Sequence, residues 1–141
     1  MERQKNALRT LMLRFQRNRD NNPGSGTEFP FVHPQSFEEV AGILRFKGTT
    51  FIYKHSTRCS VSLFAMKRLL SVVPGGDEQW VYIDVVGQRP ISLALAEELN
   101  IWHESPQLIM LQGGKVVAHC SHHQVNEDTV ESWRKTHKSE N

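Results

Sequence analysis

Residues 50–62 read Thr50-Phe51-Ile52-Tyr53-Lys54-His55-Ser56-Thr57-Arg58-Cys59-Ser60-Val61-Ser62. They predict a strand, a short turn, and a helix that opens on a cysteine. Phe51, Ile52 and Tyr53 are aromatic or β-branched, which is typical of a mostly buried strand. Apolar side chains then recur at helical spacing, at Val61, Phe64, Ala65 and Leu69. This spacing places Cys59 in the first turn of the helix.

A cysteine in that position has a reason to be reactive. The free N–H groups and the macrodipole of a helix N-terminus favour an anion, and a thiolate is one. The pKa of a cysteine, ordinarily about 8.5, falls to roughly 3.5–7.5 in such surroundings. Arg58 adds a neighbouring cation, and Ser56 or Thr57 could cap the helix. The alternative is that Cys59 is a small buried apolar residue.

Length and composition limit the possibilities. The chain has 141 residues, a net charge of +2 and two cysteines far apart in sequence. It is long enough for one domain with a proper core, and no apolar run approaches the ~20 residues of a membrane span. The cysteines do not resemble a secreted disulfide framework, which favours a reducing compartment. The modest charge gives no reason to expect nucleic-acid binding.

The first 31 residues differ from the rest. Residues 1–20 are rich in arginine and lysine, and apolar residues at helical spacing predict a basic amphipathic helix. Residues 21–26 (NNPGSG) predict a linker. We expect residues 1–31 to be a flexible basic extension and residues 32–141 to form the domain. A contact with a membrane surface or nucleic acid, and a transit peptide, are alternatives for the extension.

The rest of the chain alternates helices and strands. A capping box begins at Ser36, and the helix that follows it ends at Gly48. Asn126 or Asp128 caps the last helix. The pattern predicts strands at 50–55, 80–86, 107–111 and 115–120, and further helices at 59–72 and 92–99. Gly113-Gly114 indicates a hairpin between the last two strands. We therefore expect an α/β fold with a central four-stranded mixed sheet flanked by helices.

A second segment of interest is His103-Glu104-Ser105-Pro106-Gln107, which leads into a strand. If that strand is the antiparallel neighbour of 50–55, Pro106 faces Cys59, and the backbone of Ser105 is open to an extended thiol substrate. An ordinary proline that starts a strand is the alternative. The same arrangement brings Ser121, His122 and His123 to the rim of the cysteine site.

These motifs resemble a known family. The order of elements, the cysteine helix and the Ser105-Pro106 junction are similar to the thioredoxin-like fold. The residues at 54–62 (KHSTRCSVS), 88–92 (QRPIS), 103–107 (HESPQ) and 121–122 (SH) resemble the YtxJ family of monothiol bacilliredoxins. The resemblance spans roughly residues 37–138. Ser60 departs from it, because many relatives have proline there.

The resemblance implies a cytoplasmic bacterial oxidoreductase that removes bacillithiol from protein mixed disulfides. Cys59 would be the catalytic residue, and Ser62 occupies the position where a dithiol enzyme has its second cysteine. No bound cofactor is implied: bacillithiol would be a co-substrate, and S-thiolated proteins would be the partners. The expected thiol-substrate site consists of Thr57, Arg58, Ser60, Ser62, Glu104, Ser105, Pro106, Ser121 and His122. Arg58, His122 and Arg89 are candidates to hold carboxylates of the small thiol, although an ordinary surface charge is the favoured interpretation of Arg89.

Several alternatives stay open at this point. Cys120 is expected to be a packed strand residue, with a resolving role as the alternative. The cluster His119, Cys120, His122 and His123 invites a metal, but strand alternation lets at most two of these side chains point the same way. An iron–sulfur cluster of the kind found in some monothiol glutaredoxins, and a non-catalytic binding module, are the remaining alternatives.

Overall fold

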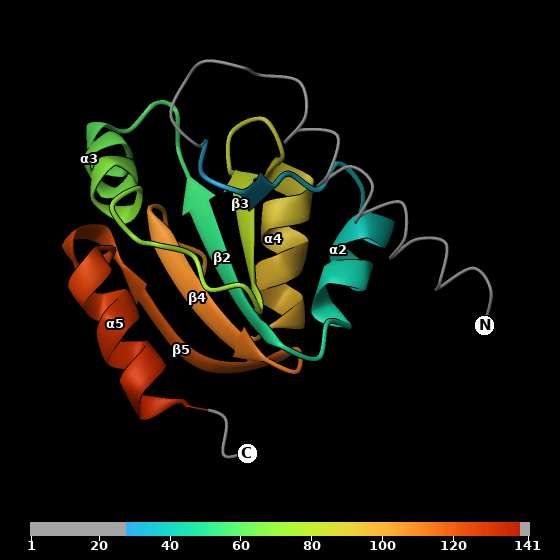
Figure 1. Cartoon of the computed structure of the whole chain (residues 1–141). Helices are drawn as coiled ribbons and strands as arrows, with labels where there is room; N and C mark the ends of the chain where they lie inside the picture. Colours follow the sequence, from blue (N-terminus) through green and yellow to red (C-terminus); the bar gives the residue numbers. More distant parts are fainter. Residues whose placement is uncertain (1–27, 139–141) are drawn as a thin grey trace.

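The structure is a computed structural model that describes residues 28–138. A five-stranded sheet with the strand order β1-β3-β2-β4-β5 forms its centre. Helices α3 and α5 cover one face of the sheet, and α2 and α4 cover the other (Figure 1). The predicted basic helix and linker lie outside the described residues.

The bounds of the elements follow the predicted order. The strands are β1 (Phe31–Val32), β2 (Thr49–His55), β3 (Glu78–Asp84), β4 (Gln107–Gln112) and β5 (Lys115–Ser121). The helices are α2 (Phe37–Leu44), α3 (Ser60–Leu69), α4 (Arg89–Glu98), the short 3₁₀ helix η1 (His122–Gln124) and α5 (Glu127–Thr136).

Strand β2 is the centre of the sheet. It pairs in parallel with β3, where Tyr53 lies opposite Tyr82, and antiparallel with β4, where Lys54 lies opposite Gln107. The predicted parallel pair, the antiparallel neighbour and the thioredoxin-like fold are therefore confirmed. Because β2 is covered on both faces, its residues are buried from Thr50 to His55 instead of on alternate positions.

The prediction of four strands is wrong by one. The fifth strand, β1, pairs in parallel with β3 and contains only Phe31 and Val32. It lies between Pro30 and Pro34, so it is too short to show a strand pattern in the sequence. The packed part of the chain reaches back to Phe29, whose ring meets Trp80 edge-on at 5.2 Å.

Successive β2 side chains enter two different cores. Phe51 and Tyr53 join the core beneath α3 and α5, and Ile52 joins the core beneath α2 and α4. All three have no exposed surface. This burial on both sides fixes the register of β2, because a shift by one residue would exchange every side chain between the two cores.

The structure confirms the predicted helix caps at Ser36 and Asn126 and the predicted hairpin turn at Gly113-Gly114. The Ser36 hydroxyl accepts a hydrogen bond from the N–H of Glu39, and Asn126 caps α5 by accepting one from Thr129. Gly113 and Gly114 both have positive φ, at 58° and 80°, as a tight hairpin turn requires. Two helices are shorter than expected: α2 ends at Leu44 and α3 at Leu69.

Candidate active site

Cys59 lies in the turn between the end of β2 and the start of α3. It is the N-cap residue of α3, with extended backbone angles of φ −116° and ψ 121°, and the helix begins at Ser60. The expectation that Cys59 belongs to the first turn is thus off by one residue. The N–H of Cys59 donates to the carbonyl of Ser56 at 3.2 Å, which closes a tight turn before the helix.

The thiol occupies the place of a capping side chain. No side chain forms a regular cap bond at this end, so the predicted caps Ser56 and Thr57 do not act as such. The N–H of Ser62, the N–H of Val61 and the Ser62 hydroxyl lie close enough to stabilise a thiolate, and together they lower the pKa of Cys59. Partial desolvation opposes them. The expected cation effect is not among the causes: Arg58 is exposed, and the lowering comes from hydrogen-bond donors of the helix itself.

Ser62 connects the thiol to the core. Its side chain has no exposed surface, and its hydroxyl oxygen accepts a hydrogen bond from the N–H of Ser56 at 3.3 Å. Its main-chain oxygen accepts one from the Tyr53 hydroxyl at 3.0 Å. The Tyr53 hydroxyl is in turn 2.8 Å from Nδ1 of His55.

Tyr53 and His55 were missed as site residues in the sequence. Burial raises the pKa of Tyr53 and lowers the pKa of His55, so both side chains are neutral near pH 7. The Tyr53 hydroxyl donates its hydrogen bond to the main-chain oxygen of Ser62, so its oxygen must accept from His55. This assigns the His55 proton to Nδ1. The signal in the sequence was their spacing of two on one strand, which puts both on the α3 face.

The second predicted segment adjoins the carboxyl end of β2. The Ser105–Pro106 peptide bond is cis, and Pro106 is buried immediately before β4. The carbonyl of Pro106 accepts a hydrogen bond from the N–H of His122 at 2.9 Å, and Ser121 lies opposite Gln107 in the sheet. Helix η1, which begins at His122, lies against α3.

The predicted site residues fall into three groups by exposure. Thr57, Arg58, Ser60 and His122 are exposed; Cys59, Glu104, Ser105 and Ser121 are half-buried; Ser62 and Pro106 are buried. The structure joins Cys59 to Ser62, and Pro106 to His122, without a hydrogen bond between the two pairs in residues 28–138. The role of these residues in substrate binding stays a prediction. Arg89 is exposed at the first position of α4 and acts electrostatically on His103.

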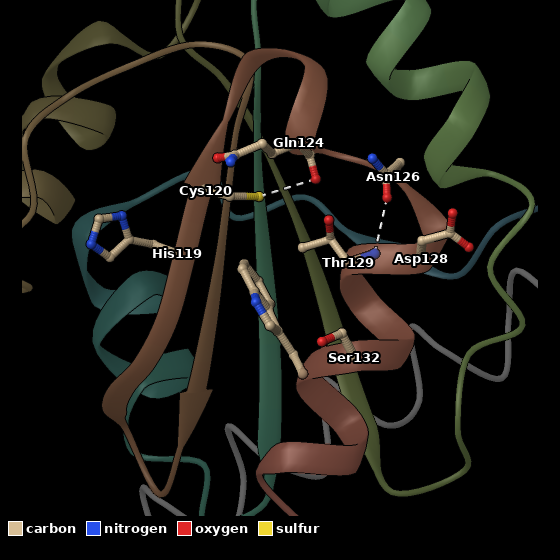
Figure 2. Close-up of a pocket in the computed structure, with 8 residues that line it drawn as sticks. His119, Cys120, Gln124, Asn126, Asp128, Thr129 and Ser132 are labelled. Carbon is tan, nitrogen blue, oxygen red and sulfur yellow. Dashed lines mark hydrogen bonds between the residues drawn. The ribbon is translucent and has the colours of Figure 1, made fainter.

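Cys120 lies in a different environment. It is 9% exposed, belongs to the core beneath α3 and α5, and its Sγ contacts the carbonyl of Gln124 at 3.4 Å. Burial raises its pKa to about 12. Figure 2 shows Cys120 on the wall of an open hollow of about 440 Å³ between β5 and α5. The residues that line this hollow are His119, Cys120, Gln124, Asn126, Asp128, Thr129, Ser132 and Trp133, so Cys59 and Pro106 are not part of it.

Within residues 28–138, no three histidine, cysteine, aspartate or glutamate side chains lie together in a way that could hold a metal ion. Strand alternation separates the candidates: His119 is exposed, whereas Cys120 points into the core. Over the same range, no helix has the length and apolar character to cross a membrane.

Comparisons with known proteins agree with this geometry. A family model described as "Monothiol bacilliredoxin BrxC" matches residues 34–130. Among solved structures, a thioredoxin-fold protein provisionally assigned as an oxidoreductase is 24% identical with a TM-score of 0.65, over 72% of this chain and 90% of that one. A thioredoxin from Malassezia sympodialis is 12% identical with a TM-score of 0.62, over 83% of this chain and 98% of its own. A mutant thioredoxin from Halobacterium salinarum is 17% identical with a TM-score of 0.62, over 82% and 99%. At these identities the solved structures establish the fold alone.

Proposed function

The chain belongs to the monothiol bacilliredoxin family, and from that premise we propose that it removes a low-molecular-weight thiol, bacillithiol, from protein mixed disulfides. The single observation that carries this proposal is the environment of Cys59. A half-exposed sulfur faces the N–H groups and hydroxyl that lower its pKa, and the buried residue three positions later is Ser62, which cannot form a disulfide.

The reaction has two exchange steps. The Cys59 thiolate attacks the sulfur of the small thiol in the mixed disulfide, and the client protein leaves as a thiolate. Cys59 is then joined to the small thiol. A second small-thiol thiolate attacks that disulfide, a low-molecular-weight disulfide leaves, and the Cys59 thiolate is restored. In these steps the small thiol acts as a co-substrate, and the proposed chemistry uses no resident cofactor.

Side chains around Cys59 support contacts with both substrates. Val61, Leu63 and Phe64 of α3 are 41%, 53% and 59% exposed, so an apolar surface lies beside the thiol for a client protein. The exposed Arg58, and His122 on η1, are the candidates to hold the carboxylates of the small thiol. The Ser105 backbone beside Pro106 is the candidate to align the disulfide. A bacterial cytoplasm, where free thiols are kept reduced, is the location we propose.

A turnover assay tests the proposal. A reporter protein carrying one bacillithiol mixed disulfide is incubated with the protein and free bacillithiol, and release of the reporter thiol is followed. We expect turnover by the wild type and by Cys120→Ala, dependence on added bacillithiol, and no turnover by Cys59→Ser. Turnover by Cys59→Ser would end the proposal, and equal turnover with glutathione in both roles would remove bacillithiol as the specific co-substrate.

A further inference from the structure

A buried lysine lies on the sheet face opposite the thiol. Lys54 directly follows Tyr53 in β2, so its side chain points toward α4 and not toward α3. It has no exposed surface, and no carboxylate is within ion-pair distance of its ammonium group in residues 28–138. A buried cation without a counter-ion is costly, so the ammonium group depends on the hydrogen bonds that it makes.

The contacts of Lys54 join strand β2, helix α4 and the loop before β4. Its Nζ donates to the main-chain oxygen of Ser92 in α4 at 3.0 Å and lies 3.3 Å from Nδ1 of His103. The hydroxyl of Ser92 is 3.4 Å from the same His103 nitrogen. His103 begins the loop that runs through Ser105 to Pro106. Lys54 therefore connects the central strand and helix α4 to the loop that borders the thiol site.

Gln107 provides a second, independent observation. It is 1% exposed, lies directly opposite Lys54 in the sheet, and its Nε2 donates to the carbonyl of Trp102 at 3.0 Å. Its Oε1 is buried and has no hydrogen-bond partner. Because directly opposite residues of an antiparallel pair share a sheet face, the side chains of Gln107 and Lys54 lie on the same face, beside each other.

We propose that Lys54 is a positioning residue for the proposed exchange: its ammonium group holds the loop from His103 to Pro106 in the conformation that presents the Ser105 backbone to the mixed disulfide. The inference rests on the proposed function because the mixed disulfide is the substrate proposed there. The contact between Lys54 and the loop does not depend on any substrate. Burial lowers the pKa of Lys54 to about 8, so the hold weakens in mildly alkaline solution.

The charged surroundings of Lys54 support this assignment. From α4, the ionisable group is Arg89. The loop contributes Glu104 and His103, and the pKa of His103 is lowered by burial, by Lys54 and by Arg89. At the neighbouring register positions, β3 contributes Ile83 and β4 contributes Gln107, neither of which titrates. Burial brings the pKa of Lys54 to about 8, so this lysine is the group that we expect to couple the loop to pH in that range.

Kinetics with Lys54→Met test the inference, with Lys115→Met as the control because Lys115 is an exposed lysine on β5. In the bacillithiol assay we expect Lys54→Met to raise the KM for the mixed disulfide roughly tenfold, since small displacements of positioning groups have large effects. The alkylation rate of Cys59 should stay within about twofold of wild type. An unchanged KM, or an alkylation rate that falls by the same factor as turnover, would overturn the inference.

A second measurement covers the case in which Lys54→Met does not fold. In Cys59→Ser, which removes the thiol titration, we expect the amide resonance of Ser105 to shift with a midpoint near pH 8, as the lowered lysine pKa requires. A resonance that does not move between pH 7 and pH 9 would contradict the hold on the loop. If wild type shows no bacillithiol-dependent turnover, the proposed function fails, while this titration still decides the inference.

Discussion

The Tyr53 hydroxyl donates a hydrogen bond to the main-chain oxygen of Ser62 over 3.0 Å, and so ties the central strand to the first turn of α3. The N–H of the same Ser62 is the largest cause of the lowered pKa of Cys59. The turn that stabilises the thiolate is therefore held from beneath by the buried core.

The first prediction concerns the Ser62 hydroxyl. Ser62→Ala removes one of the donors that stabilise the thiolate but keeps the main-chain N–H, so the pKa of Cys59 rises. A hydrogen bond of about 1 kcal/mol corresponds to roughly a fivefold change. We expect the iodoacetamide alkylation rate of Cys59 at pH 7 to fall about fivefold. Ser60→Ala is the matched control, because Ser60 is an exposed serine two residues earlier in the same helix. A rate in Ser62→Ala equal to that of the control would rule out the hydroxyl contribution.

The second prediction concerns Tyr53. Tyr53→Phe removes the hydroxyl that contacts both Ser62 and His55, and leaves the main-chain oxygen and a buried imidazole without that partner. We expect the free energy of unfolding in urea to fall by about 1–3 kcal/mol. Tyr82→Phe is the control, because Tyr82 faces the same core edge and is only half-buried. Equal effects of the two substitutions would show that the Tyr53 hydroxyl has no special role.

The third prediction concerns pH and Lys54. Its pKa is about 8 in the folded protein and 10.5 in the unfolded chain, so between these values the unfolded chain binds more protons than the folded one. Stability contributed by this residue must therefore rise with pH in this window, by about 1.4 kcal/mol per pH unit at most. Lys54→Met lacks the group and should not show this rise. Urea unfolding of both proteins from pH 7 to pH 10 measures the difference, and parallel curves would contradict an ammonium group buried without a counter-ion.

The fourth prediction concerns Cys120. Burial raises its pKa to about 12, so it is a poor nucleophile and its thiol is protonated at any physiological pH. A colorimetric thiol titration should detect one fast cysteine in the native protein and two after denaturation. Cys59→Ser should lose the fast phase, and Cys120→Ala should keep it. A fast phase that persists in Cys59→Ser would assign reactivity to Cys120.

Much of the fold followed from local patterns. The buried run of β2, the Gly113-Gly114 hairpin and the caps at Ser36 and Asn126 each have a short-range physical cause, and the structure has them where expected. Strand β1 could not be predicted from local patterns, because its two residues gain their strand conformation only by pairing with β3.

The site was harder to predict than the fold. The position of Cys59 could be inferred to within one residue from helix spacing, but the cause of its lowered pKa could not. We expected Arg58 to contribute, whereas an exposed side chain is free to point into solvent and the fixed N–H groups of Val61 and Ser62 are not. The polar contacts of Tyr53 and Lys54 depend on which face each meets, and they become apparent only once α3 and α4 are placed on opposite sides of the sheet.

The most direct measurement is the intact mass of the protein isolated from its native cells after mild oxidant treatment. We predict a single covalent adduct, mapped to Cys59 by peptide sequencing, that adds the mass of bacillithiol less two hydrogens to the reduced protein and leaves Cys120 unmodified. An internal bridge between Cys59 and Cys120, with no small-thiol adduct, would contradict the monothiol account.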